Sequence, residues 1–354
     1  MTIKNNLKTG GNRMKKKMLS VVLSVALVTS MLIGCGSGES EKKSAETKTE
    51  DTKETKEEKT DGEAKSGGYK IAYLNALVST PYFGYLNSAM EGHAKELGVE
   101  LQILDGKTDN QVMYDQALSI IEQDFDAVIL TPSDMAGSVS IVEAIHDAGL
   151  PLIVCNTRVD ESVEALTDSL VCCDPSYEGE VVGKLAVEQL PEGGKCVTLE
   201  GFAGQEAQIY RTEGFQKGIK GSKIEIVQQV ICDWDKAKAM SATDDMIAAY
   251  PDLAMIFAQD DSMALGAIEA VKAAGKEDQI KVMGLGYMGD ESKEALLDGS
   301  LLGTCTQSPS WEGITALDVA IDVIKGKEVD TWYKTECLAV TKENCESIDH
   351  GYNQ

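Results

Sequence analysis

Two adjacent carboxylates mark the point where an apolar, strand-like run gives way to a helix-like one. In the stretch FAQDDSMALGA, an apolar run leads into Asp260 and Asp261, and a small, helix-like run follows at once. A helix N-cap accepts backbone N–H bonds and the helix dipole favours a negative charge there, so we expect Asp261 to cap the helix. Asp260 is then free to accept a hydrogen bond from a ligand hydroxyl. The alternative is that both are solvated turn residues.

Other aromatic and hydrogen-bonding residues also follow apolar, strand-like runs. They are Thr80 to Phe83, Asp105, Thr131, Ser133, Asp134, Asn156 to Arg158, the region before Arg211, Trp234, Gly286, Tyr287 and Gln307. Aromatic faces stack on the C–H faces of a sugar, while amides and carboxylates meet its hydroxyls. The set contains no nucleophile–base pair. It therefore indicates a binding site for a polyhydroxylated ligand, with no catalysis and no cofactor.

The elements that must position these residues alternate along the chain. Strands are expected at 69–76, 99–105, 126–132, 150–156, 195–201, 223–232, 253–259, 280–286 and 301–307, and helices at 82–98, 110–123, 136–149, 178–190, 210–221, 235–250, 262–275, 290–299 and 310–326, before a short apolar tail at 335–341. Alternation with short connections means parallel sheets covered by helices on both faces. We therefore expect an α/β fold of two doubly wound lobes. Ligands of such sheets bind at the carboxyl ends of the strands.

Composition excludes several classes of function. The 354 residues carry a formal net charge of −25, which would repel nucleic acid. The nine cysteines form no CxxC pair, and several lie in apolar runs, so we expect mostly free, buried thiols. The three histidines are far apart in sequence, and no metal site is expected.

The N-terminal part has the features of an export signal. Three lysines precede an apolar stretch that ends in LIGC at Cys35, which resembles the lipobox of bacterial lipoproteins. We expect a signal peptide over 1–34, with Met14 a better start than Met1. The resemblance implies cleavage after Gly34, lipidation of Cys35, and anchoring to the outer face of the cytoplasmic membrane. A retained membrane anchor is the alternative. Residues 36–68 lack Val, Ile, Leu and aromatic residues, so we expect 35–68 to be a disordered tether.

The folded part resembles the type I periplasmic-binding-protein superfamily, in particular the ribose-binding-like sugar receptors of ABC transporters. The resemblance rests on STPYFGYLNSAMEGHAKELG, AVILTPSDMAGSV, EGFAGQEAQIYRTEGF, FAQDDSMALGAIEAVKAAG and LLDGSLLGTCTQSPSWEG. It implies a monomer that closes two lobes over a monosaccharide or polyol and delivers it to an ABC permease. The hinge crossings fall near Cys173, Gln307 and Cys337. The first lobe is then 69–173 plus 307–336, and the second is 174–306 plus 337–354.

The same resemblance carries functional residues to this chain one by one. Tyr82, Phe83 and Trp234 stand at sugar-stacking positions, and Arg211 and Gln307 stand at hydrogen-bonding positions. Asp260 stands at a position that is commonly Asn, Asn156 and Thr157 stand where ribose receptors have an Asp-Arg pair, and Thr80 and Thr131 stand where they have asparagines. Tyr287 lies beside the position of an aspartate that is missing here. Whether Arg158 reaches into the site instead is open. These departures put ribose itself in doubt as the ligand.

Rival interpretations remain open at this level. The stretch Gly284 to Gly289 fits G-x-G-x-x-G, a dinucleotide-binding pattern, or else a flexible turn. A sugar-sensing receptor for a chemotaxis or kinase system, and a binding protein for a nucleoside or another small non-sugar solute, are alternatives to transport of a sugar. The stretch 105–111 hints at calcium-ligand spacing but lacks the closing Glu, so we interpret it as a turn and a helix cap.

Overall fold

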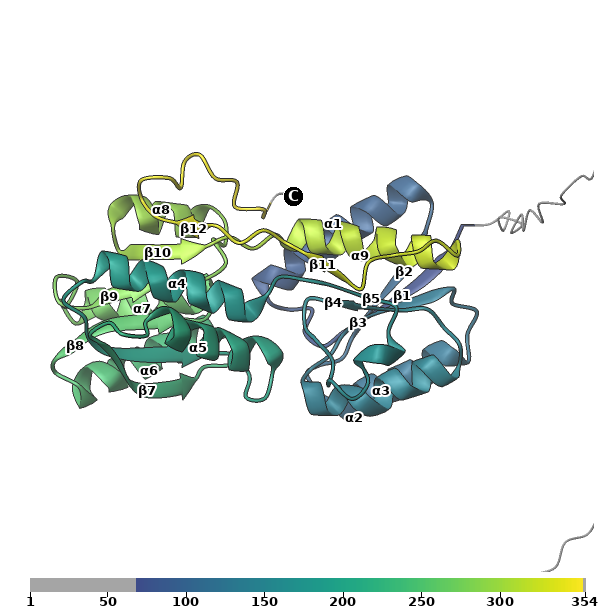
Figure 1. The fold of residues 1–354 in the computed structure, drawn as a ribbon, viewed down its shortest axis with the longest axis horizontal. Helices are drawn as coiled ribbons and strands as arrows, with labels where there is room; N and C mark the ends of the chain where they lie inside the picture. Colours follow the sequence, from purple (N-terminus) through teal and green to yellow (C-terminus); the bar gives the residue numbers. More distant parts are fainter. Residues whose placement is uncertain (1–67, 353–354) are drawn as a thin grey trace, which may run out of the picture. The chain divides into compact units, whose positions relative to one another are not determined.

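The computed structural model describes residues 68–352, and within them the chain builds two six-stranded sheets (Figure 1). The predicted signal peptide, the predicted lipidation site at Cys35 and the predicted tether up to residue 67 lie outside the described residues. None of the helices described combines the length and apolar character that crossing a bilayer requires.

The first sheet has the strand order β11-β5-β4-β3-β1-β2, all parallel, and we call it lobe 1 together with its helices. Its elements are β1 (Lys70–Asn75), α1 (Pro81–Leu97), β2 (Glu100–Asp105), α2 (Asn110–Ile121), β3 (Ala127–Thr131), α3 (Met135–Asp147), β4 (Leu152–Cys155), the short 3-10 helix η1 (Glu164–Leu166), β5 (Ser169–Cys172), α9 (Pro309–Ile324) and β11 (Trp332–Lys334).

The second sheet has the order β12-β10-β9-β8-β6-β7, and only the β10–β12 pair is antiparallel; with its helices it is lobe 2. Its elements are α4 (Pro175–Gln189), β6 (Gly194–Glu200), α5 (Glu206–Gly218), β7 (Ile224–Ile231), α6 (Lys236–Ala249), β8 (Leu253–Ala258), α7 (Asp261–Ala273), β9 (Lys281–Met283), α8 (Asp290–Asp298), β10 (Leu301–Cys305) and β12 (Ala339–Val340).

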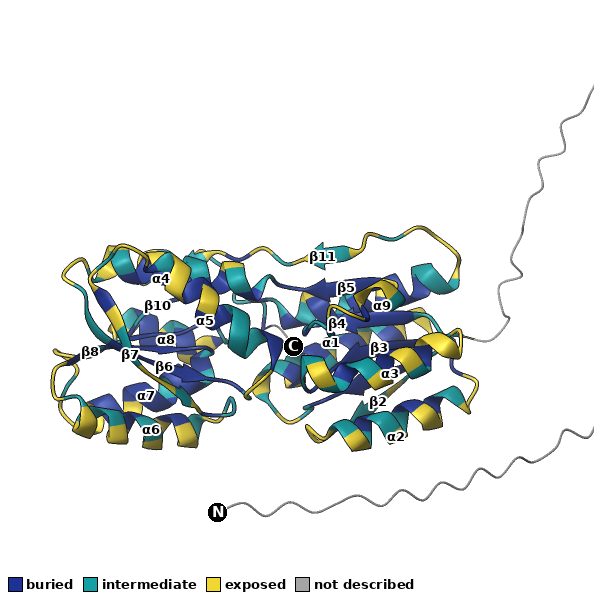
Figure 2. Ribbon diagram, turned by 60° about the horizontal axis from the view of Figure 1, so that its bottom comes forward, coloured by how far each residue is buried: buried dark blue, intermediate teal, exposed yellow. Residues whose placement is uncertain are grey.

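The inner strands of each sheet are buried on both faces, as their nearly continuous apolar sequences require, whereas the edge strands β2 and β7 are partly exposed (Figure 2). Along β1, Ile71 and Tyr73 pack against α1 and α9, whereas Ala72 and Leu74 belong to the cluster under α2 and α3. In lobe 2, α4 and α5 cover one face of the sheet, and α6, α7 and α8 cover the other. The predicted doubly wound α/β lobes are confirmed.

The chain passes between the two sheets three times, which confirms the expected three-crossing hinge. It leaves lobe 1 after β5, returns after β10 through α9, and leaves again between β11 and β12. The exact residue limits given above for the lobes stay a prediction. Two short strands, β5 and β11, were not predicted, because runs of three or four residues give too little periodicity to recognise.

Several local signals acted as expected. Gly98 ends α1 with a left-handed φ of 70°, a conformation that glycine adopts without steric cost. In the stretch 105–111, Asp109 caps α2 by accepting from the backbone N–H groups of Gln111 and Val112, so the predicted helix cap is confirmed. The eight cysteines within the described chain are all buried and free.

Candidate functional site

A cavity of about 60 Å³ lies at the carboxyl ends of the strands of both sheets. By the same measure one water needs ~10–15 Å³, so the cavity has room for several waters or one small ligand. Its lining is Leu77, Thr80, Pro81, Tyr82, Phe83, Asn156 and Thr157 from lobe 1, Gln205, Ala207, Arg211, Trp234, Asp260 and Met288 from lobe 2, and Gln307 from the second crossing.

The structure brings together all the predicted ligand-binding residues except Thr131 and Tyr287. Those that line the cavity are Thr80, Tyr82, Phe83, Asn156, Thr157, Arg211, Trp234, Asp260 and Gln307. Sequence reasoning missed Leu77, Gln205, Ala207 and Met288. Position was a signal for three of them, since Leu77, Gln205 and Met288 follow strands β1, β6 and β9 at their carboxyl ends. That any of these residues contacts a ligand stays a prediction.

Thr131 and Tyr287 have other roles because their hydroxyls are fully buried and bonded within the lobes. The Thr131 hydroxyl donates to the Cys155 carbonyl at 2.8 Å and lies 2.9 Å from the Tyr73 hydroxyl. The Tyr287 hydroxyl donates to the Cys345 carbonyl at 2.6 Å and so holds the C-terminal tail. Neither side chain lines the cavity.

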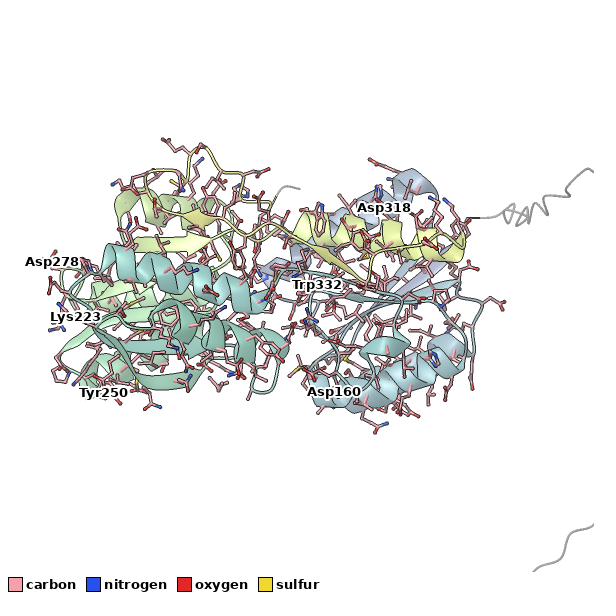
Figure 3. All side chains as sticks on the ribbon, viewed as in Figure 1. Asp160, Lys223, Tyr250, Asp278, Asp318 and Trp332 are labelled. Atoms are coloured by element: carbon pink, nitrogen blue, oxygen red, sulfur yellow. The ribbon has the colours of Figure 1, made fainter. Side chains whose placement is uncertain are left out.

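The Arg158 side chain does not line the cavity but bridges the lobes. Its Nε lies 3.0 Å from Glu206 Oε1, and its backbone N–H donates to Glu206 Oε2 at 2.8 Å. The guanidinium also stacks 3.9 Å from the ring centre of Trp332, which is labelled in Figure 3. Burial raises the pKa of Glu206 to about 7, although Arg158 opposes this shift.

The first turn of α1 presents two aromatic rings to the cavity. Thr80 caps the helix, with its side chain accepting from the Phe83 backbone N–H, and Pro81 occupies the first helical position, where a missing N–H costs nothing. Tyr82 and Phe83 therefore lie at the very start of the helix. Their rings meet edge to face, with centroids 5.5 Å apart. The local sequence thus fixes where these rings stand.

The backbone conformation of Trp234 and the neighbouring Gly201 determine where the indole ring lies. Asp233 and Trp234 both have left-handed φ values, 55° and 57°, between β7 and α6. A Cβ on Gly201 would lie 1.9 Å from the indole, so only glycine leaves room for the ring there. The indole N–H donates to Gln205 Oε1 at 2.7 Å, and Arg211 stands 5.6 Å from the ring centre. The ring therefore lines the cavity beside the Arg211 guanidinium.

The expectation that Asp261 caps the helix was wrong. Asp260 is the N-cap of α7, because its Oδ1 accepts from the Met263 backbone N–H at 2.7 Å. Asp261 is fully buried and accepts from the Thr304 hydroxyl at 2.8 Å and the Met288 backbone N–H at 3.0 Å. The alternative of two solvated turn residues is excluded as well. Asp260 still lines the cavity, and burial raises its pKa to about 7.

Asp260→Asn should therefore separate the cap from the ligand acceptor. Asparagine caps helices as well as aspartate does, whereas Asp260→Ala should cost about 0.5–2 kcal/mol of stability. At pH 4, where the raised pKa keeps Asp260 neutral in the folded protein, we expect the Asn variant to keep the melting temperature of the parent and the Ala variant to lose several degrees in differential scanning calorimetry. Equal losses in both variants would show that the cap does not account for what Asp260 contributes to stability.

Arg211 forms the buried ion pair of the site. Its Nε lies 3.0 Å from Glu178 Oε2, and its Nη1 donates to the Gln259 carbonyl at 2.8 Å. Although burial opposes it, the charge of Glu178 raises the pKa of the guanidinium, so Arg211 stays charged. Within the described chain, no group of three or more His, Cys, Asp or Glu residues is placed to hold a metal ion.

Comparison with known proteins gives one consistent result. The family model described as "Periplasmic binding protein domain" matches residues 71–328. The ribose import binding protein of Bacillus subtilis is 30% identical over 75% of this chain and 85% of its own length.

Solved structures agree with this match. An ABC transporter solute-binding protein of Bacillus halodurans with bound myo-inositol is 28% identical, with a TM-score of 0.75 over 80% of this chain and 97% of that one. A periplasmic solute-binding protein of Actinobacillus succinogenes with bound D-allose is 25% identical, with a TM-score of 0.73 over 79% of this chain and 100% of that one.

Proposed function

Since the chain belongs to the periplasmic binding protein family, of the type I, ribose-binding-like kind, we propose that it captures a neutral monosaccharide or polyol between its two lobes and delivers it to an ABC permease. The family consists of substrate-binding transport proteins and not of enzymes. The dinucleotide interpretation of Gly284 to Gly289 is therefore dropped, and these residues form the turn that leads into α8.

The observation that carries this proposal is the composition of the cavity described above. Tyr82, Phe83 and Trp234 offer aromatic faces, while Asn156, Arg211, Asp260 and Gln307 offer donors and acceptors from both lobes and a crossing. A sugar or polyol presents C–H faces and hydroxyls that fit such a set. The relatives above are named for ribose or were solved with myo-inositol and D-allose, which are all neutral and polyhydroxylated.

The charges around the cavity disfavour an anionic ligand. The guanidinium of Arg211 is already paired with Glu178, and that of Arg158 with Glu206. Asp260 in the lining adds a further carboxyl group. A sugar phosphate or sugar acid would therefore meet no unpaired cation among these residues. Neutral ligands avoid that penalty.

The place of the protein in the cell follows from the sequence outside the described residues. A lipid on Cys35 would anchor the chain to the outer face of the cytoplasmic membrane, and the polar tether would hold the binding domain away from the bilayer. The working unit would be a monomer. A receptor that presents the sugar to a chemotaxis or kinase system is the second candidate, because capture between two lobes serves both purposes equally well.

The test is isothermal titration calorimetry of the purified protein with D-ribose, D-allose, myo-inositol, other monosaccharides, and adenosine as a representative nucleoside. We expect one sugar or polyol to bind with micromolar or tighter affinity, which corresponds to a binding free energy of about −8 kcal/mol or a more negative value. Binding of adenosine alone would keep the family and replace the ligand class. Absence of binding to every sugar and polyol would contradict the proposal.

A further inference from the structure

Glu312 is a fully buried carboxylate that lies behind the cavity without lining it. It stands in the first turn of α9, where the helix dipole favours a negative charge. Three donors converge on it: the Tyr82 hydroxyl at 2.7 Å, the Asn156 side-chain amide at 3.1 Å and the Cys173 backbone N–H at 3.2 Å. Two of these partners line the cavity, and the third lies at the first crossing between the lobes.

Close packing of two helices brings Glu312 to this place. The next residue, Gly313, approaches the Leu86 carbonyl of α1 so closely that a Cβ there would lie 2.5 Å from the oxygen. Helices α9 and α1 can therefore meet at the turn that carries Tyr82. Backbone packing of the two helices, and not a flexible surface contact, therefore places the Glu312 carboxylate beside the Tyr82 hydroxyl.

The hydrogen bonds to Glu312 determine what its partners can offer a ligand. The Tyr82 hydroxyl has a single proton, which it gives to Glu312, so it can only accept from a ligand. Asn156 has a left-handed φ of 67°; its amide donates to Glu312 and its Oδ1 accepts from the Thr157 hydroxyl at 3.1 Å. Both ends of the Asn156 amide are therefore oriented before a ligand arrives.

We propose that Glu312 is a positioning residue of the ligand site: it holds the Tyr82 hydroxyl and the Asn156 amide in place at the cavity before a ligand binds, and it ties both to the backbone of the first crossing. This inference rests on the proposed function for its ligand, but its geometry does not depend on which ligand binds. Glutamine at this position has one acceptor oxygen and an N–H₂ group, so it cannot serve all three donors.

A matched control is present in lobe 2. Glu200 is also buried and accepts three hydrogen bonds, from the Thr198 and Thr212 hydroxyls and from the Gln208 amide. It does not line the cavity and contacts no residue of lobe 1 through these bonds. Glu200→Gln therefore repeats the loss of a buried carboxylate at a residue whose three donors do not line the cavity.

The first experiment needs no ligand. 3-Fluorotyrosine is placed at Tyr82 alone, and its fluorine NMR resonance is compared in the parent, Glu312→Gln and Glu200→Gln proteins. We expect the resonance to shift or broaden in Glu312→Gln and to stay unchanged in Glu200→Gln. An unchanged resonance in Glu312→Gln would overturn the proposal, since Tyr82 would then not depend on Glu312.

The second experiment measures affinity for whichever of D-ribose, D-allose and myo-inositol the parent binds. We expect Glu312→Gln to weaken binding about 10- to 100-fold, as buried partners left unpaired commonly do, and Glu200→Gln to change it less than twofold. Tyr82→Phe combined with Glu312→Gln should be no weaker than the worse single variant. Additive losses would overturn the proposal. If the parent binds none of the three, the proposed function loses support, while the NMR result still decides the role of Glu312.

Discussion

Replacing Arg211 with methionine should lower the free energy of unfolding by about 3–5 kcal/mol, the usual cost of leaving a buried charge without its partner. The Arg211 and Glu178 side chains are 7% and 0% exposed, and their Nε–Oε2 distance is 3.0 Å. Without the guanidinium, the Glu178 carboxylate has no opposite charge beside it, and its Oε1 already lacks a hydrogen-bond partner. Urea denaturation followed by circular dichroism measures this loss.

A second variant separates stability from binding. Adding Glu178→Leu to Arg211→Met removes the orphaned charge, so much of the lost stability should return. Affinity for the ligand should not return, because the guanidinium at the cavity is still missing. If the double variant is as unstable as the single one, packing of the arginine stem, and not its charge, is responsible.

The ligand-free protein should become less stable as the pH rises from about 4 to about 7. Burial raises the pKa values of Glu206, Asp260 and Glu312 to about 7, from ordinary values of 4.5, 3.8 and 4.5. Between these limits the folded state keeps protons that the unfolded state has released, so the free energy of unfolding falls with rising pH. Each group contributes at most about 1.4 kcal/mol per pH unit, and the decline ends above the folded pKa.

Urea denaturation at intervals between pH 4 and pH 8.5 measures how steeply the free energy of unfolding falls with pH. Glu206→Gln, Asp260→Asn and Glu312→Gln should each make the decline shallower, because each removes one titrating group. Other carboxyls with lowered pKa values, such as Asp160 and Asp252, act in the opposite direction, but they are exposed and contribute little. A slope that stays the same in all three variants would show that these carboxyls do not hold protons in the folded state.

The lobes were predictable because their signal is repeated and local. Runs such as 253–258 and 127–130 are apolar throughout and alternate with amphipathic segments, which restricts the chain to parallel sheets covered on both faces. Strands β5 and β11 escaped because each is a short strand that is stabilised by a neighbour far away in sequence. Their pairing is a property of the sheet and not of the segment.

Most of the cavity lining was predictable for a similar reason. Residues that follow strands of a parallel sheet meet at one edge, so Asn156, Trp234, Asp260 and Gln307 could be grouped from their positions in the sequence. Thr131 ends strand β3 and Tyr287 follows strand β9, yet their hydroxyls bond buried partners inside the lobes. Position along a strand says where a residue lies, but the direction of its side chain depends on the surrounding packing.

By itself, the sequence determined the α/β class, the alternation of strands and helices, the absence of a nucleophile–base pair and the strand ends where a ligand could bind. These properties depend on residues close together in the chain. Only the tertiary structure decided which of two adjacent aspartates caps α7, that Arg158 pairs with Glu206, and that Glu312 joins Tyr82, Asn156 and the first crossing. Those contacts join residues up to 230 positions apart, and only the packing of helices and lobes brings such residues within hydrogen-bonding distance.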